Sequence, residues 1–380
     1  MSSIVDTPFS NLPQPKSGWQ LFKNLAFGTL TPGLAWQNPA YRRKFMLRSL
    51  ATPISTARLL TSLAKQPRLM QMLQVQPGLP CRLHRPWLTV KMDRQHALES
   101  LNWHYQTLSR QLPATLLAGY LSKPGYTLLT LTGKEEQQFT VRLCADAFLD
   151  KEGEATLAFC DRHNTVLAEM TFTLCQFAGK TTLFIGGLQG AKAHVPHELI
   201  QGATKACHGL FPKRLLLEAA MTLGTAFPVE QIVAVSNATH IYRSWRYRKK
   251  KEGKLLADYD SFWISIGGEK QDNGHFLLPL AMPRKPMEEI ASKKRAESNR
   301  QPNANPLSRA PATARGKTSY AAESVPPPRP AFPLLSPLQW LNPVLTNDEW
   351  LWRSRAACSS GHRQAPWQFG GIRRRTPDDT

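Results

Sequence analysis

The first 122 residues repeat apolar positions at the three- and four-residue spacing of α-helices. Prolines such as Pro53 and Pro113 interrupt this pattern, and proline ends or breaks a helix because it lacks the backbone N–H. The helix-compatible stretches are 19–27, 40–50, 55–73 and 94–112. We therefore predict a mainly helical N-terminal region over residues 1–122.

From about residue 126 the apolar spacing changes to every second position, which is typical of half-buried strands. In the run "VLAEMTFTL", Ala168, Met170 and Phe172 share one face, while Glu169 and Thr171 share the other. Polar turn segments separate this run from similar runs before and after it. The pattern predicts an antiparallel meander.

A helix and a short strand are predicted after the meander. Pro212 fits the first turn of a helix whose apolar face carries Leu215 and Leu223, and the run Ile232–Val235 fits a buried strand. The order of helices, meander, helix, strand and helix is that of an α+β fold with an antiparallel or mixed sheet. We assign residues 123–297 to this core domain.

The last part of the chain, residues 298–380, differs from the rest. It is rich in proline, as in "VPPPRPAFP", and shows no sustained apolar period. Such a composition is typical of disordered or extended segments. Its final stretch has the composition of an arbitrary reading frame, which predicts a frameshifted or fused tail.

The net charge of +21 and the pI near 10 predict an anionic partner. An acyl carrier, RNA and acidic lipid head groups all meet this condition, and charge alone does not separate them. The N-terminus lacks a basic start followed by an apolar run, and no stretch reaches the roughly 18 apolar residues of a spanning helix. We therefore expect a cytoplasmic protein, either free or peripheral at the inner membrane.

Cysteine and histidine spacing argues against a metal site. None of the six cysteines forms a CxxC pair. The spacing of His194, His197 and His208 fits no recognised ligand set, so we expect no metal.

The segment "SNATHIYRSWRYRKKK" combines aromatic and basic residues directly after the predicted strand. Its candidates for anion binding are Arg243, Arg246, Arg248 and Lys249. Arginine and aromatic side chains together can hold phosphates and stack bases, which leaves RNA binding open. No helix-turn-helix or other DNA-binding motif accompanies them. The simpler alternative is a solvated basic face.

Four motifs in a fixed order resemble the VirK/YbjX family of Gram-negative bacteria. They are "IGGLQGAK" (Ile185–Lys192), "HGLFPKRLLLEA" (His208–Ala219), "AVSNATHIYRSWRYRKKK" (Ala234–Lys251) and "DYDSFW" (Asp258–Trp263). The resemblance covers about residues 20–297. The chain departs from it at Phe211, where the family pattern has Arg, and after residue 297, where a basic, tyrosine-containing helix should continue.

The resemblance implies a role in envelope homeostasis and virulence. It links the chain to tolerance of cationic antimicrobial peptides and to the display of a surface virulence factor. The family has no established biochemical activity, so the resemblance assigns no catalytic residue.

The element order also resembles the acyl-CoA N-acyltransferase (GNAT) arrangement, in which a glycine loop after a strand binds the cofactor pyrophosphate. This resemblance implies contacts of Gly187, Gln189 and Gly190 with acyl-CoA or an acyl-carrier protein, for backbone N–H groups in such a loop can hold phosphate. The alternative is a strand exit that simply needs glycine.

Under the acyl-transfer hypothesis, Asn237, His240 and Tyr242 face the acyl group. Tyr242 is the candidate general acid, and His240 or Asp258 is the candidate base. Asp258 and Asp260 share one face if they lie in a strand, whereas a helix would separate them. The alternatives are that these acids only pair with the basic run, and that the protein is an RNA-binding or membrane-surface accessory factor without catalysis.

Overall fold

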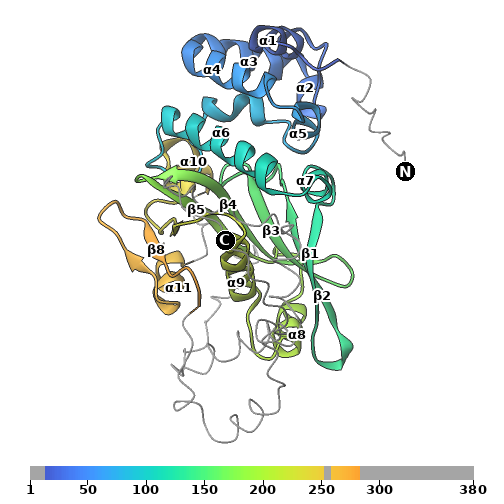
Figure 1. Cartoon of the computed structure of the whole chain (residues 1–380), viewed down its shortest axis with the longest axis vertical. Helices are drawn as coiled ribbons and strands as arrows, with labels where there is room; N and C mark the ends of the chain where they lie inside the picture. Colours follow the sequence, from blue (N-terminus) through green and yellow to red (C-terminus); the bar gives the residue numbers. More distant parts are fainter. Residues whose placement is uncertain (1–12, 252–257, 283–380) are drawn as a thin grey trace, which may run out of the picture.

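The computed structural model describes residues 13–251 and 258–282 (Figure 1). Within these residues a layer of helices lies at one end, and a mixed sheet of eight strands with further helices follows along the chain. The predicted α+β class is confirmed, including a helical N-terminal region followed by a mixed sheet.

Helices fill the N-terminal region. They are α1 Gly18–Phe27, α2 Leu34–Gln37, α3 Pro39–Ala51, α4 Pro53–Ala64, α5 Leu69–Val75, the 3-10 helix η2 Leu79–His84, α6 Arg94–Gln111 and α7 Ala114–Tyr120. Side chains cap α1 and α6: the hydroxyl of Ser17 accepts from the N–H of Gln20, and Asp93 accepts from the N–H of His96. The single helix predicted over 55–73 is two helices, because Pro67 lies in the connection and disfavours continuation.

The remaining elements form and cover the sheet. The strands are β1 Tyr126–Thr132, β2 Gln138–Cys144, β3 Ala155–Asp161, β4 Val166–Phe177, β5 Lys180–Gly190, β6 Gln231–Ala234, β7 Glu269–Lys270 and β8 Phe276–Leu278. The helices are η3 Lys134–Glu136, α8 His197–Ala206, α9 Pro212–Thr225, η4 Ile241–Arg243, α10 Trp245–Lys251 and α11 Tyr259–Ser265.

The strand order is β1-β2-β3-β4-β5-β6-β8-β7. The meander β1–β5 is antiparallel, as predicted, and β5 pairs with β6 in parallel through the crossover that contains α8 and α9. Helix α6 packs on β4, and α9 packs across β3, β4 and β5. Figure 1 shows α6 across the upper end of the sheet and α9 in front of its lower half.

The glycine-rich run Gly186–Gly190 lies inside β5, which corrects the expected loop between a strand and a helix. Gly187 is opposite Thr171 of β4, and Gly190 is opposite Ala168. The strand therefore continues through the glycines, and the next helix begins only at His197.

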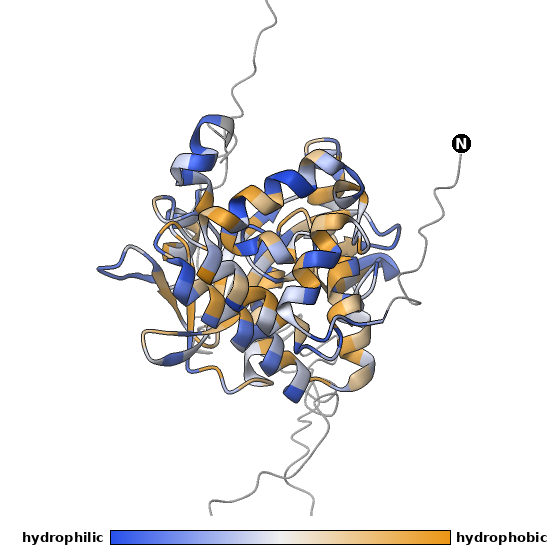
Figure 2. Ribbon diagram, turned by 90° about the horizontal axis from the view of Figure 1, so that it is seen from above, coloured by the Kyte–Doolittle hydropathy of each residue, from blue (hydrophilic) through white to orange (hydrophobic). Residues whose placement is uncertain are grey.

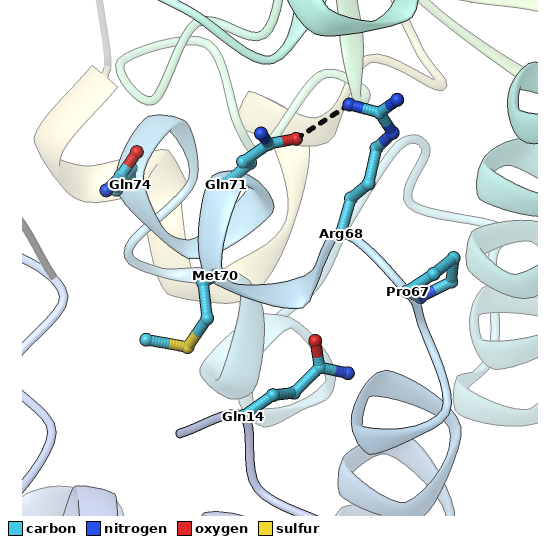
Figure 3. Close-up of a pocket in the computed structure, with 6 residues that line it drawn as sticks. All are labelled: Gln14, Pro67, Arg68, Met70, Gln71 and Gln74. Atoms are coloured by element: carbon cyan, nitrogen blue, oxygen red, sulfur yellow. Dashed lines mark hydrogen bonds between the residues drawn. The ribbon is translucent and has the colours of Figure 1, made fainter. Parts of the chain in front are cut away.

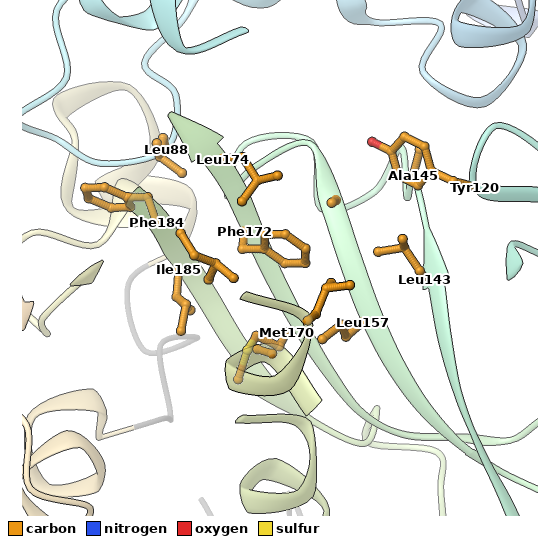
Figure 4. Packing of buried hydrophobic residues seen from close by; sticks show 14 of the residues in the cluster. Leu88, Tyr120, Leu143, Ala145, Leu157, Met170, Phe172, Leu174, Phe184 and Ile185 are labelled. Carbon is orange, nitrogen blue, oxygen red and sulfur yellow. The ribbon is translucent and has the colours of Figure 1, made fainter. Parts of the chain in front are cut away.

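One buried apolar cluster extends from the N-terminal helices to the last strand. Around the sheet it includes Leu88, Phe172, Leu174, Phe184 and Ile185 (Figure 4). The secondary structure changes near residue 122, but the core is shared, and the division into two domains stays a prediction. The predicted tail, residues 298–380, lies outside the described residues.

A buried ion-pair network fastens η2 to the loop before β3. Arg82, fully buried, contacts Glu154 (Nε to Oε1, 2.7 Å) and Asp150 (Nη1 to Oδ2, 2.8 Å). Burial opposes ionisation of Asp150, but Arg82, Arg85 and Lys151 together hold its pKa below the usual value. Tyr105 of α6 also donates to Glu154 at 2.7 Å. The network joins three segments that are far apart in sequence.

Replacing Arg82 by Leu should lower the free energy of unfolding by about 3–5 kcal/mol, because Glu154 loses its only cationic partner among the ion pairs found in the described residues and Asp150 loses one of three. Urea denaturation measures the effect. Arg58→Leu on the exposed side of α4 is the matched control and should stay within about 0.5 kcal/mol of the wild type. A loss for Arg82→Leu no larger than that of the control would contradict the role given to this network.

His104 should make stability fall in acid. It is fully buried, its Nδ1 accepts from the N–H of Leu174, and burial lowers its pKa to about 3. The unfolded chain takes up this proton near pH 6.5. The contribution is therefore complete above pH 6.5 and is lost as pH falls toward 3, by at most about 1.4 kcal/mol per pH unit.

The comparison of His104→Gln with the wild type isolates this effect. The stability difference between the two proteins should shrink as pH falls from 6.5 to 4 in urea denaturation. The exposed His194→Gln is the control and should follow the wild type at every pH. A pH-independent difference for His104→Gln would refute the assignment.

Candidate functional site

A buried carboxylate, Glu152, lies at the centre of a polar group at the end of β5. It belongs to the loop "DKEGE" (150–154) between β2 and β3, and it is fully buried. The side-chain amide of Gln189 donates to both of its oxygens, at 3.0 and 2.9 Å. The phenol of Tyr242 forms a further hydrogen bond with it. Several donors thus converge on one charge that water does not reach.

His240 approaches the same carboxylate from the loop after β6. Its Nε2 lies 3.9 Å from Oε1 of Glu152, and both side chains are buried. Its Nδ1 accepts the backbone N–H of Tyr242 at 3.2 Å. Because Nδ1 is used as an acceptor, the ring proton lies on Nε2, toward Glu152. The geometry therefore points the Nε2–H of His240 toward the carboxylate, at a distance longer than a hydrogen bond.

Two tyrosines complete the group. The ring of His240 stacks on Tyr259 (centroids 5.1 Å apart) and meets Tyr242 edge-on (4.8 Å). Burial, and then the charge of Glu152, raises the pKa of both phenols, so both keep their proton at neutral pH. Tyr259 is buried and its hydroxyl oxygen accepts the backbone N–H of Leu188 at 3.2 Å, whereas Tyr242 stays partly exposed. Tyr242 is thus the member of the pair that a ligand can reach.

The glycines of β5 make room for Glu152. A Cβ at Gly187 would lie 1.8 Å from Oε2 of Glu152, and one at Gly186 would lie 1.9 Å from its backbone oxygen. No side chain larger than hydrogen fits there while the loop keeps its position. The two glycines are therefore explained by the approach of the acidic loop, and contacts of Gly187 and Gly190 with a cofactor stay a prediction.

Asn237, Asp258 and Asp260 form a separate cluster that fastens the loop after β6 to α11. Asn237 donates its side-chain amide to Asp258 (2.8 Å) and its backbone N–H to Asp260 (2.6 Å). Asp258 caps α11 through the N–H of Ser261, and Asp260 also pairs with Lys270 at 2.9 Å. The two acids lie at a helix start and not in a strand. Asn237 thus bridges the loop after β6 to α11.

The four predicted anion-binding residues have different surroundings. Arg243 donates to the backbone oxygen of Asn237 (3.1 Å) and so supports the loop. Arg246 lies near His84, where burial and then a group of arginines lower the histidine pKa to about 4. Arg248 and Lys249 are exposed on α10. Arg243 is exposed as well, so Arg246 is the one of the four that is half-buried.

Glu152 was not among the residues predicted from the sequence, although it is the centre of the group. The available signal was local: three acids at 150, 152 and 154 around Gly153, in a chain with a large excess of bases. The structure brings Gly187, Gln189, His240 and Tyr242 together around it. Asn237, Asp258 and Asp260 are joined to this group through Tyr259, whose backbone N–H donates to Asn237 at 2.8 Å.

Other places in the described residues offer less chemistry. A hollow beside α5 is lined by Gln14, Pro67, Arg68, Met70, Gln71 and Gln74 (Figure 3). It contains no acid or base besides Arg68, which bonds to Gln71 at 3.1 Å. Over residues 13–251 and 258–282, no three His, Cys, Asp or Glu side chains gather closely enough to bind a metal ion. In the same residues, no helix has the length and apolarity to span a membrane.

Comparisons with known proteins point to one family. A family described as "Protein of unknown function (DUF535)" matches residues 35–302. The chain is 48% identical over 300 residues to "Uncharacterized protein YbjX" of Escherichia coli. The aligned region covers 79% of this chain and 90% of that protein. An "Uncharacterized protein" of Haemophilus influenzae is 32% identical over 145 residues, 38% of this chain and 47% of that protein.

Gly187→Ala should lower the free energy of unfolding by about 1–3 kcal/mol, because its methyl group overlaps Glu152. Adding Glu152→Ala removes the overlap, so the double variant should lose less unfolding free energy than the two single variants lose in sum. Gly202→Ala, in α8 with open space around it, is the control and should be neutral or slightly stabilising. Urea denaturation of the four proteins measures the coupling, and strictly additive losses would contradict the contact.

Proposed function

This chain belongs to the DUF535 family, the VirK/YbjX proteins, and we propose that it is an acyltransferase that uses acyl-CoA or an acyl-carrier protein. The observation that carries the proposal is the divergence of β5 and β6. Their last paired residues are Ile185 and Ala234, and beyond them β5 continues to Gly190 on β4 alone. The segment that follows β6 turns away from β5 at Ser236. Ligands of sheets with parallel strands bind outside the carboxyl ends, where neighbouring strands part.

The order of the elements supports the same proposal. An antiparallel meander leads through α8 and α9 to a strand parallel to β5, and α11 with the hairpin β7–β8 follows. This order resembles the acyl-CoA N-acyltransferase (GNAT-like) arrangement. Because fold does not fix function, the chemical argument comes from the Glu152 group at the divergence.

Glu152 and Tyr242 carry the protons in the proposed reaction. The acceptor amine or hydroxyl attacks the thioester carbonyl, a C–N or C–O bond forms, and the C–S bond breaks. The acceptor proton passes to the phenol oxygen of Tyr242 while the phenol proton moves to Glu152, its hydrogen-bond partner. Glu152 then returns this proton to Tyr242, which protonates the leaving thiolate, so the enzyme regains its starting state.

The neighbouring residues take supporting roles in this proposal. The base is Glu152 in place of His240 or Asp258, because Nδ1 of His240 accepts a backbone N–H and Asp258 caps α11. Gln189 and His240 hold the carboxylate in position. Gly187 and Gly190 contribute the open strand edge along which the cofactor would lie.

The envelope role belongs to the same proposal. A protein at the cytoplasmic face of the inner membrane that acylates an envelope component would alter the packing of that component. Such a product would connect acyl transfer with tolerance of cationic antimicrobial peptides and with the display of a surface virulence factor.

The alternative of binding without catalysis has one observation in its favour. Trp245 is 80% exposed and lies on α10 beside Arg248 and Lys249. An exposed aromatic ring with neighbouring cations is a stacking platform for single-stranded RNA. RNA binding by a protein that fails to bind acyl thioesters would favour this alternative.

Acyl-CoA and acyl-carrier protein should bind to the purified full chain at micromolar concentration and release free thiol when an amine or alcohol acceptor is present. Tyr242→Phe and Glu152→Gln should each lower kcat about 100-fold or more, the usual effect of removing a proton-transferring group. KM for the thioester should change far less, because neither group binds the acyl chain. Calorimetry measures binding, and a thiol-reactive dye measures turnover.

Tyr126→Phe, at a partly exposed tyrosine of β1, is the matched control and should keep wild-type turnover. Folding of each variant is checked by circular dichroism and urea denaturation. Absence of thioester binding by the folded wild type at high micromolar ligand, or full turnover by Tyr242→Phe, would refute acyl transfer at this site.

A further inference from the structure

The part of the N-terminal helical region that precedes α6 and its cap Asp93 is basic and contains no acid among its described residues. Between Thr7 and Met92 the sequence has no Asp or Glu. The described part of this stretch carries twelve basic side chains: Lys16, Lys23, Arg42, Arg43, Lys44, Arg48, Arg58, Lys65, Arg68, Arg82, Arg85 and Lys91. Arg82 and Arg85 pair with carboxylates of the later "DKEGE" loop. The other ten have no acid in their own layer to neutralise them, so this end of the molecule attracts anions.

The same layer exposes large apolar side chains. On α3 and at the start of α4, Leu47 is 66% exposed, Leu50 is 75% exposed and Ile54 is 68% exposed. Leu47 and Leu50 are one turn apart on the side of α3 away from its buried Phe45. Arg43 and Lys44 are exposed on the preceding turn of α3. This helix therefore presents aliphatic and basic groups together to the outside.

Helix α1 repeats the combination with aromatic residues. Trp19 is 66% exposed and Phe27 is 76% exposed. Lys23 lies between them at four-residue spacing, with its Nζ 6.0 Å from the ring of Trp19. Helix α1 packs against both α3 and α4, so the three helices form one layer. Figure 2, which looks down on this end, shows hydrophobic and hydrophilic segments interleaved on the helices.

We propose that α1, α3 and α4 form a docking surface for an anionic lipid bilayer. Exposed aliphatic and aromatic side chains would enter the boundary between head groups and acyl chains, and the adjacent Lys and Arg would contact lipid phosphates. A bilayer supplies both an apolar boundary and negative charge, which is the complement of this layer. RNA supplies charge and bases that stack on aromatic rings, but it leaves the exposed aliphatic Leu47, Leu50 and Ile54 without a partner.

This surface is separate from the proposed acyl-transfer site and does not depend on it. The Glu152 group is built from the loop before β3, from β5 and from the loop after β6, whereas the docking surface uses residues before 65. Membrane binding and thioester turnover can therefore be lost independently.

Sedimentation of the full chain with vesicles tests the proposal. The chain should bind vesicles of phosphatidylglycerol and phosphatidylcholine and should bind pure phosphatidylcholine far less. Leu47→Ser, Leu50→Ser and Ile54→Ser in one protein should weaken binding at least tenfold at 0.15 M salt. Arg43→Glu with Lys44→Glu should weaken it by a similar factor, as each basic residue near an anionic surface contributes roughly fivefold. Hydrogen exchange should slow in α1, α3 and early α4 on vesicles.

Matched changes elsewhere serve as controls. Phe148→Ser with Ile264→Ser removes two apolar side chains that are 83% and 64% exposed outside the layer. Lys134→Glu with Lys180→Glu reverses two exposed charges outside it. Both controls should bind vesicles like the wild type. Equal loss of vesicle binding in the controls, or no preference for anionic vesicles, would overturn the proposal. So would wild-type vesicle binding by the variant with Leu47→Ser, Leu50→Ser and Ile54→Ser together with salt-sensitive RNA binding by the full chain.

Discussion

The buried ion pairs of Arg82 set the position of the loop on which the candidate site depends. Arg82 contacts Asp150 and Glu154, the two ends of the loop, and these acids flank Glu152 in the sequence. Between them Gly153 has φ of +154°, and a Cβ there would lie 2.8 Å from the backbone oxygen of Phe172. With both ends fixed and the backbone close to β4, Glu152 turns into the space above Gly187. One guanidinium in the helical layer thus orders a carboxylate beside the sheet.

Much of the fold could be predicted from periodicity, because the long amphipathic segments bury one face each. Helices α1, α6 and α9 and the meander β1–β5 lie close to their predicted ranges. The glycine run was misassigned because glycine is read locally as a turn residue, whereas Gly186 and Gly187 are needed for a neighbour 34 or more positions earlier. Such a close approach leaves no local pattern in the strand.

The candidate site could be predicted only in part for the same reason. His240, Tyr242 and Gln189 were found through their motifs, but the charge that unites them comes from a loop whose meaning depends on tertiary contacts. Asp258 was given a catalytic role that its surroundings do not favour. Its capping contact with Ser261 was readable as a helix start from the sequence alone. The role of Glu152 could be found only in the structure, because it follows from burial. A buried carboxylate needs hydrogen-bond donors to stay ionised, and the sequence does not show that Glu152 is buried.

The distribution of acids connects the two proposed surfaces. The helical region before Asp93 has no acid of its own, so the buried Arg82 and the partly exposed Arg85 are neutralised by carboxylates from the "DKEGE" loop. Its remaining basic residues are left to the outside. The contacts that hold the layer on the sheet are therefore the same contacts that order Glu152. A bilayer bound to α1, α3 and α4 would fix the orientation of the whole molecule, because the layer and the sheet share one core. The divergence of β5 and β6 would then lie at a constant height above the membrane, which suits an acceptor that is itself held in the bilayer.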